Sequence, residues 1–160
     1  MSEPKSTSAP KPTTVEVRVP SRMGFEKVAM STAASVAKLM GFRDDRIEDL
    51  KTAVAEACIN AIEHGNRLNE KLSVVVVLSA SADSLEVKVI DDGKGIKTQP
   101  DKLGKVNKPD IDRKMRGEED PRGMGMFLIQ ALVDEAEWVA GTDGNSSYVR
   151  LVIRLDKDAE

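Results

Sequence analysis

The stretch of sequence that decides the fold is EACINAIEHG, at positions 56–65. It ends a longer segment, Asp44 to His64, in which apolar residues recur at the spacing of an α-helix. At about 100° per residue, the residues on the apolar side are Ile47, Leu50, Val54, Cys58 and Ala61. The side nearly opposite carries Glu56, Asn60, Glu63 and His64. The pattern predicts an amphipathic helix, with Gly65 as the residue that ends it.

The polar side of this helix has the composition of a chemical site. A solvated helix face is the plain alternative, but asparagine is a poor residue for a helix interior. The face also lacks the Glu–Lys pairs, four residues apart, that usually decorate a solvated helix. A carboxylate at Glu56 suits proton transfer, and an amide oxygen one turn later at Asn60 suits Mg²⁺. His64 is the only histidine of the chain, and its plain interpretation is a helix C-terminal cap.

Two glycine-containing motifs follow at a distance. Residues 91–95, Asp-Asp-Gly-Lys-Gly, come directly after a predicted strand, and taken alone they indicate a turn. Residues 122–126, Arg-Gly-Met-Gly-Met, open a predicted helix, where backbone N–H groups and the helix dipole favour phosphate. Met124 and Met126 suit either the core or the wall of an adenine site. Each glycine motif alone is common. Together with the segment Glu56–Gly65, in this order and separation, the two motifs predict a pocket for a Mg-nucleotide.

Composition narrows the class of protein. A chain of 160 residues is enough for one domain with a real core. The net charge of -3 and the pI of about 5.4 give no indication of nucleic acid as a direct partner. The single cysteine excludes an intramolecular disulfide, no run reaches the ~20 apolar residues of a membrane span, and no signal peptide opens the chain. We therefore expect a soluble, cytoplasmic protein that does not bind membranes.

The rest of the chain predicts an α+β fold, a two-layer sandwich with helices on one face of a mixed, mostly antiparallel sheet. Residues 1–13 are rich in Pro, Ser, Thr and Lys and are predicted to be a disordered tail. Residues 97–121 lose all periodicity, so they are either disordered or a functional lid. The predicted helices are Ser21–Leu39, with Ser21 as N-cap and Gly41 as terminator, Asp44–His64 and Gly123–Val133. The predicted strands are Val15–Val19, Leu72–Ser79, Leu85–Ile90, Glu135–Ala140 and Tyr148–Leu155.

Together, these motifs resemble those of the GHKL family (gyrase, Hsp90, histidine kinase, MutL), whose ATP-binding domain has the Bergerat fold. The segment from Glu56 to Gly65 is similar to the N box of that family. Asp91-x-Gly93-x-Gly95 is similar to its G1 box, and Gly123-Met124-Gly125 to its G2 box. The resemblance covers residues 14–156. Within the family, the chain looks like the bacterial anti-sigma factor serine kinases.

The resemblance implies a role for each motif residue. Glu56 would be the catalytic general base, Asn60 the Mg²⁺ ligand, and Asp91 the acid that reads the amine of adenine. The other residues expected around the nucleotide are Glu63, His64, Gly93, Gly95, Ile96, Arg122, Gly123, Met124, Gly125 and Met126.

The resemblance also implies a lid. Residues 97–121 would close over ATP, and this segment is longer than in compact members of the family. An arginine just before the G2 glycines usually reaches the γ-phosphate, which points to Arg122. Arg122 abuts Gly123 directly, and the lid is longer than in compact members, so Arg113 and Arg116 are the alternatives.

The implied activity is that of an anti-sigma factor serine/threonine-protein kinase that uses ATP and Mg²⁺. It would phosphorylate an anti-sigma factor antagonist of the STAS type and, in another state, sequester a sigma factor. By resemblance, the protein would be a homodimer. Two alternatives stay open: a nucleotide-gated protein-binding switch without kinase turnover, and a kinase that acts on a partner-switching protein outside sigma-factor control. Glu56 favours the enzyme, since a pure binder needs no base there.

Overall fold

The computed structural model describes residues 11–92, 121–141 and 146–156, and the account below concerns these residues. Five strands form one sheet: β1 (Thr13–Pro20), β2 (Ser73–Ala80), β3 (Ser84–Asp91), β4 (Glu135–Val139) and β5 (Ser147–Arg154). The helices are α1 (Glu26–Met40), α2 (Asp44–Asn60) and α4 (Pro121–Leu132), and α2 continues into one turn of π-helix, η1 (Ala61–Gly65).

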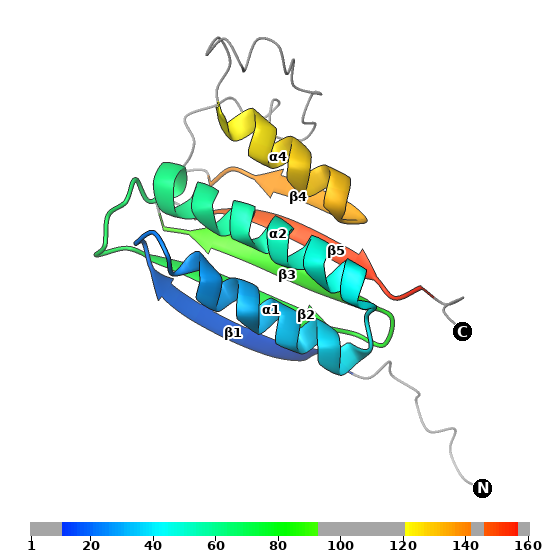
Figure 1. The fold of residues 1–160 in the computed structure, drawn as a ribbon. Coiled ribbons are helices and arrows are strands. Elements are labelled where there is room, and N and C mark those ends of the chain that lie inside the picture. Colours follow the sequence, from blue (N-terminus) through cyan, green and yellow to red (C-terminus); the bar gives the residue numbers. More distant parts are fainter. Residues whose placement is uncertain (1–10, 93–120, 142–145, 157–160) are drawn as a thin grey trace, which may run out of the picture.

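The sheet has the strand order β1-β2-β3-β5-β4, with β3 in the middle. Each of the four pairings between described strands is antiparallel. Helices α1, α2 and α4 all lie on one face of this sheet, as Figure 1 shows. The predicted two-layer α+β sandwich is therefore confirmed, with an antiparallel sheet in the described part of the chain.

The core lies between the sheet and the helices. Alternate residues of β2 and β3 point towards the helices because successive side chains of a strand alternate between its two faces. Val76, Leu78 and Val87 are fully buried in this way, and Leu50 and Val54 of α2 are buried against them from the other layer. The five residues predicted for the apolar side of the α2 segment are all buried, which confirms the predicted face: Ile47, Leu50, Val54, Cys58 and Ala61.

Cys58 belongs to this core rather than to any reactive site. Its side chain has no exposed surface, and burial raises the pKa of the Cys58 thiol to about 12, with a smaller contribution from the charge of Glu26. A thiol in this state stays protonated at neutral pH and behaves as a small apolar group.

Several predicted boundaries are corrected by the structure. Ser21 is not the N-cap of α1, since the helix begins at Glu26 after Phe25 and has no side-chain cap. Gly41 does end α1, with a φ of 92° that glycine adopts without strain. Thr13, placed in the predicted tail, is the first residue of β1, and the strand runs through Pro20, which pairs with Ser73.

The predicted lid overlaps helix α4 at one residue. Pro121, the last residue of the predicted lid, is the first residue of α4. The rest of that segment, residues 97–120, lies outside the described residues, as do residues 1–10 of the predicted tail. Among the helices that the structure describes, none combines the length and the apolar character needed to cross a membrane.

Candidate active site

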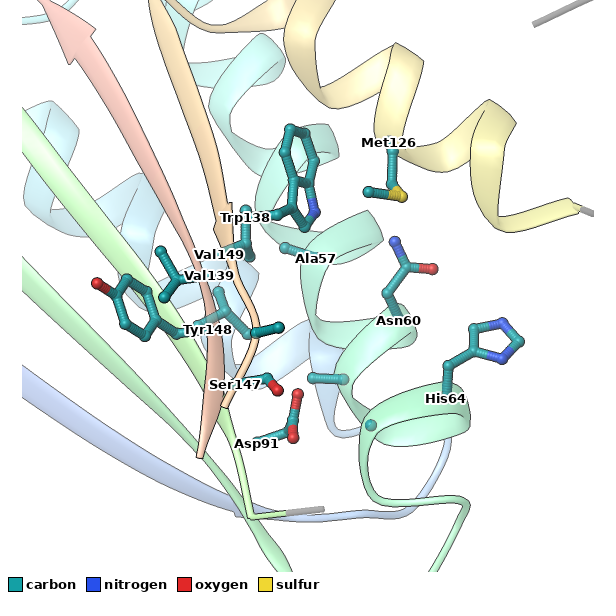
Figure 2. A pocket seen from close by; sticks show the side chains of 14 residues that line it. Ala57, Asn60, His64, Asp91, Met126, Trp138, Val139, Ser147, Tyr148 and Val149 are labelled. Atoms are coloured by element: carbon teal, nitrogen blue, oxygen red, sulfur yellow. The ribbon is translucent and has the colours of Figure 1, made fainter. Parts of the chain in front are cut away.

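A cleft opens between the C-terminal end of α2, the π-turn η1, helix α4 and the edge of the sheet at β4 and β5 (Figure 2). Its volume is about 570 Å³, counting its open mouth. The residues that line the cleft are Ala57, Asn60, Ala61, His64, Gly65, Val89, Asp91, Met126, Trp138, Val139, Ala140, Ser147, Tyr148 and Val149.

Asp91 lies at one end of the cleft. It is the last residue of β3, and its neighbours across the sheet are Val74 and Ser147. Only 7% of its surface is exposed. Figure 2 shows the carboxylate of Asp91 next to Ser147 and directed towards η1. A buried carboxylate in a largely apolar cleft can recognise a hydrogen-bond donor of a flat ligand.

Gly65 has a different role from the predicted one. It does not end a helix in a left-handed conformation but lies inside η1, whose C-cap is Asn66. A Cβ atom added at Gly65 would lie 2.5 Å from both Cγ and Oδ2 of Asp91. No real Cβ contact is that short, so the residue here must be glycine for the carboxylate to lie against the main chain.

This contact predicts the sign of a stability change. At a helical position, replacing glycine by alanine usually stabilises a protein by about 0.4–1 kcal/mol. Gly65→Ala is expected instead to lower the free energy of unfolding by about 1–3 kcal/mol, the usual cost of overpacking. Urea denaturation of the variant measures this change. In the Asp91→Gly background the obstructing carboxylate is gone, so the same substitution should become neutral or stabilising. An equal loss in both backgrounds would contradict the contact.

Asn60 and Glu56 lie at the other end of the cleft, under the start of α4. Asn60 is the last residue of α2, and in Figure 2 its amide points from α2 towards α4. A Cβ added at Gly125 of α4 would lie 3.0 Å from Oε2 of Glu56 and 3.8 Å from Oδ1 of Asn60. The carboxylate and the amide therefore share one small space below the first turn of α4. Glu56 is half-buried and does not itself line the cleft, whereas the next residue, Ala57, does.

The third motif lies at the start of α4, as predicted. The helix begins at Pro121, two residues before the predicted Gly123, so Gly123 and Gly125 belong to its first turns. Met126 lines the cleft. The side chains of Arg122 and Met124 lie outside the described residues, and so do Gly93, Gly95, Ile96, Arg113 and Arg116.

Glu63 and His64 lie in η1, where the backbone is no longer α-helical. The N–H of Asn66 donates to the carbonyl of Ala61, five residues earlier, over 2.8 Å. A π-turn holds more residues per turn than an α-helix, so the predicted helical phase does not apply beyond Asn60. His64 lines the cleft, whereas Glu63 is exposed and does not. The two side chains approach each other, with 3.7 Å between His64 Nε2 and Glu63 Oε2.

Sequence reasoning missed the wall that faces α2. Trp138 of β4 and Ser147 of β5 line the cleft, together with the strand residues Val89 and Val149. Trp138 is the only tryptophan of the chain, and its place in an alternating strand beside Ala136 was a usable signal. Ser147 carried no signal of its own, because only its pairing with Asp91 brings it to the site.

The donor atoms of the site suit a cation held jointly with phosphate. Among the residues with described positions, no three His, Cys, Asp or Glu side chains form a group that would hold a metal ion by themselves. The oxygen atoms near Gly125 are a carboxylate of Glu56 and an amide of Asn60. Mg²⁺ prefers such oxygen ligands and completes its shell with water and phosphate, so these residues fit it.

Comparison with known proteins identifies the family. Residues 20–153 match the family described as the histidine kinase-like ATPase domain. The chain belongs to this family. Curated relatives of this ATPase domain include the serine-protein kinase RsbW of Oceanobacillus iheyensis, which is 33% identical over 125 residues and covers 77% of each chain. The RsbW of Bacillus subtilis is 32% identical over 124 residues, which cover 76% of this chain and 74% of the relative.

A solved structure agrees with the fold of this ATPase domain. The crystal structure of the RsbU and RsbW domains of a Mycobacterium tuberculosis protein superimposes with a TM-score of 0.62 at 19% sequence identity. The match covers 92% of this chain and 34% of the solved chain. At that identity, the similarity supports the two-layer fold and nothing about activity.

Proposed function

We propose that this ATPase domain is an anti-sigma factor serine/threonine-protein kinase. It would bind Mg-ATP, phosphorylate a STAS-type anti-sigma factor antagonist, and in another state sequester a sigma factor. The RsbW relatives support the kinase activity through their names, which describe serine-protein kinases. We further propose residues 14–156 as the kinase domain, with a lid over ATP between residue 97 and the start of α4, and a homodimer as its assembly.

The observation that carries this proposal is the meeting of three distant motifs around one cleft. Asp91 comes from β3, Asn60 from α2 and Met126 from α4, and all three line it. The buried Asp91 suits the adenine end, whereas Asn60, Glu56 and the first turns of α4 suit the phosphate end. A nucleotide that extends from Asp91 to the start of α4 would therefore have its adenine beside Asp91 and its phosphates beside Glu56 and Asn60.

The proposed chemistry is transfer of the γ-phosphoryl group to a serine or threonine hydroxyl. Glu56 would take the proton of the attacking hydroxyl, since a half-buried carboxylate below α4 lies near the phosphate end. The backbone N–H groups in the first turn of α4, around Gly123 and Gly125, would bind the phosphates. Asn60 would hold Mg²⁺, which when bound neutralises charge on the phosphates. Trp138 and Met126 would exclude water from the adenine.

The direct test is phosphate transfer from labelled ATP to a purified antagonist protein. The expected result is incorporation of label on a serine or threonine of that antagonist, dependent on Mg²⁺. A protein that binds Mg-ATP but labels no antagonist would overturn the kinase proposal and leave a nucleotide-gated binding module. A protein that binds no nucleotide would overturn the assignment of the cleft as well.

The adenine end gives a separate prediction. Asp91→Asn is expected to weaken Mg-ATP binding about 5- to 150-fold, because losing a buried hydrogen bond costs roughly 1–3 kcal/mol. Titration calorimetry measures the affinity. The matched control is Asp92→Asn, the same change at an exposed neighbour, which should bind like the wild type. Wild-type affinity in Asp91→Asn would remove this residue from the adenine site.

A further inference from the structure

Asn66, the residue directly after Gly65, is a buried amide that the three motifs leave unexplained. Only 2% of its surface is exposed. It caps η1 and lies where four parts of the chain meet: the end of the π-turn, the loop before α1, the start of β2 and the end of β3. A buried polar side chain far from water is retained only with its hydrogen bonds made, so its partners indicate what it holds in place.

Both ends of the Asn66 amide are used. Its Oδ1 accepts a hydrogen bond of 2.9 Å from the backbone N–H of Asp92. Its Nδ2 donates to Oγ of Ser21 over 2.7 Å and to the carbonyl of Ser73 over 3.0 Å. The hydroxyl of Ser21 in turn donates to the carbonyl of Leu72 over 2.8 Å, so it can only accept from Asn66. The donors and acceptors therefore fix the orientation of the amide.

Asn66 is connected to both partners of the contact between Gly65 and Asp91. Asn66 follows Gly65 in the chain, and its Oδ1 holds the residue that follows Asp91. The main chain at Gly65 and the end of β3, which carries Asp91, are thus tied to each other by one side chain. Asparagine suits this position because it offers an acceptor and two donors within a short side chain, and neither serine nor alanine does.

We propose that Asn66 is a positioning residue that sets Asp91 for recognition of adenine. The inference rests on the proposed function, because Asp91 must read the base for its position to matter. Asn66 does not line the cleft and would not contact the ligand itself. It acts through the end of β3, and its effect on affinity is therefore confined to the adenine half of the nucleotide.

The test compares two ligands, Mg-ATP and inorganic triphosphate with Mg²⁺, by titration calorimetry. Asn66→Ala is expected to weaken ATP binding about 5- to 100-fold, the usual effect of losing one buried hydrogen bond, here the proposed bond between Asp91 and adenine. Binding of triphosphate should stay within about 3-fold of the wild type, since independent sites rarely couple more strongly. A general loosening of the fold would instead weaken both ligands equally, and that outcome would overturn the proposal.

Two further variants separate positioning from stability. Ser21→Ala removes a bond from the same buried cluster but leaves the bond to Asp92, so ATP affinity should stay within about 3-fold of the wild type. In the Asp91→Asn background, Asn66→Ala should weaken ATP binding no further, because both changes remove the same interaction. Additive losses would show that Asn66 does not act through Asp91.

The wild type provides a check that does not depend on a variant folding. The amide proton of Asp92 should exchange slowly even without nucleotide, because Asn66 accepts its hydrogen bond. Fast exchange there would contradict the proposal. Failure of the wild type to bind ATP would overturn the proposed function, whereas ATP binding through Asp91 that Asn66→Ala leaves unchanged would overturn this inference alone.

Discussion

Glu56→Gln is expected to lower phosphoryl transfer on the order of 10²- to 10⁴-fold, the usual contribution of a positioned general base. Glutamine has nearly the shape of glutamate, so it should keep the packing below Gly125, where a methyl group would lie 3.0 Å from Glu56 Oε2. Mg-ATP affinity should stay close to that of the wild type, because Asn60, Asp91 and helix α4 are unchanged. The rate of label transfer to the antagonist and a nucleotide titration measure the two quantities.

The control for this variant is Glu48→Gln. Glu48 is an exposed carboxylate two turns earlier on α2, and its side chain forms an ion pair with Lys51. Its backbone carbonyl accepts a hydrogen bond from the hydroxyl of Thr52, which the substitution leaves in place. It should transfer phosphate at the wild-type rate, which excludes a general effect of removing charge from the helix. Full activity in Glu56→Gln would exclude Glu56 as the base, since no amide can accept the proton of a hydroxyl.

Asn60→Ala is expected to affect both transfer and the response to magnesium. Loss of the amide oxygen should abolish the gain in ATP affinity that Mg²⁺ provides. Transfer should fall at least on the order of 10²-fold, since a bound metal contributes several kcal/mol of charge stabilisation at the transition state. Calorimetric titration of ATP with and without Mg²⁺ measures the first effect, and label transfer measures the second.

The same experiment contains its own controls. ATP affinity in the presence of a chelator should match the wild type, because Asp91 and the adenine end of the cleft are untouched. Asn60→Asp keeps an oxygen ligand and should retain the Mg²⁺ dependence that Asn60→Ala loses. If Asn60→Ala responds to Mg²⁺ like the wild type, Asn60 is not the metal ligand.

The features that the sequence predicted well are those that depend on local periodicity. The valine-rich run of residues 72–79 and the alternation of residues 85–90 predicted strands β2 and β3, and the structure moves those boundaries by one residue. The apolar side of α2 was correct because helical phase follows directly from residue spacing. The grouping of Asn60, Asp91 and Met126 in one cleft agrees with the motif order, although no local pattern brings them together.

The features that were missed depend on contacts between residues far apart in the chain. Ser21 resembles an N-cap, yet its hydroxyl bonds to Leu72, 51 residues away. Gly65 resembles a helix terminator, yet glycine is required there because the carboxylate of Asp91 leaves no room for a Cβ atom. Trp138 was missed at the cleft because strand alternation does not say which helix a face will meet. Local propensity describes one segment, and tertiary packing decides what that segment touches.

The glycine at position 65 makes one wall of the cleft out of main chain. Every residue type except proline presents the same N–H and C=O groups, so a point mutation there would change this wall mainly by adding a side chain. The carboxylate of Asp91 leaves no room for it. A change in the shape or polarity of the cleft is therefore expected to arise at side chains elsewhere in its lining, such as Trp138, Val139 and Ser147.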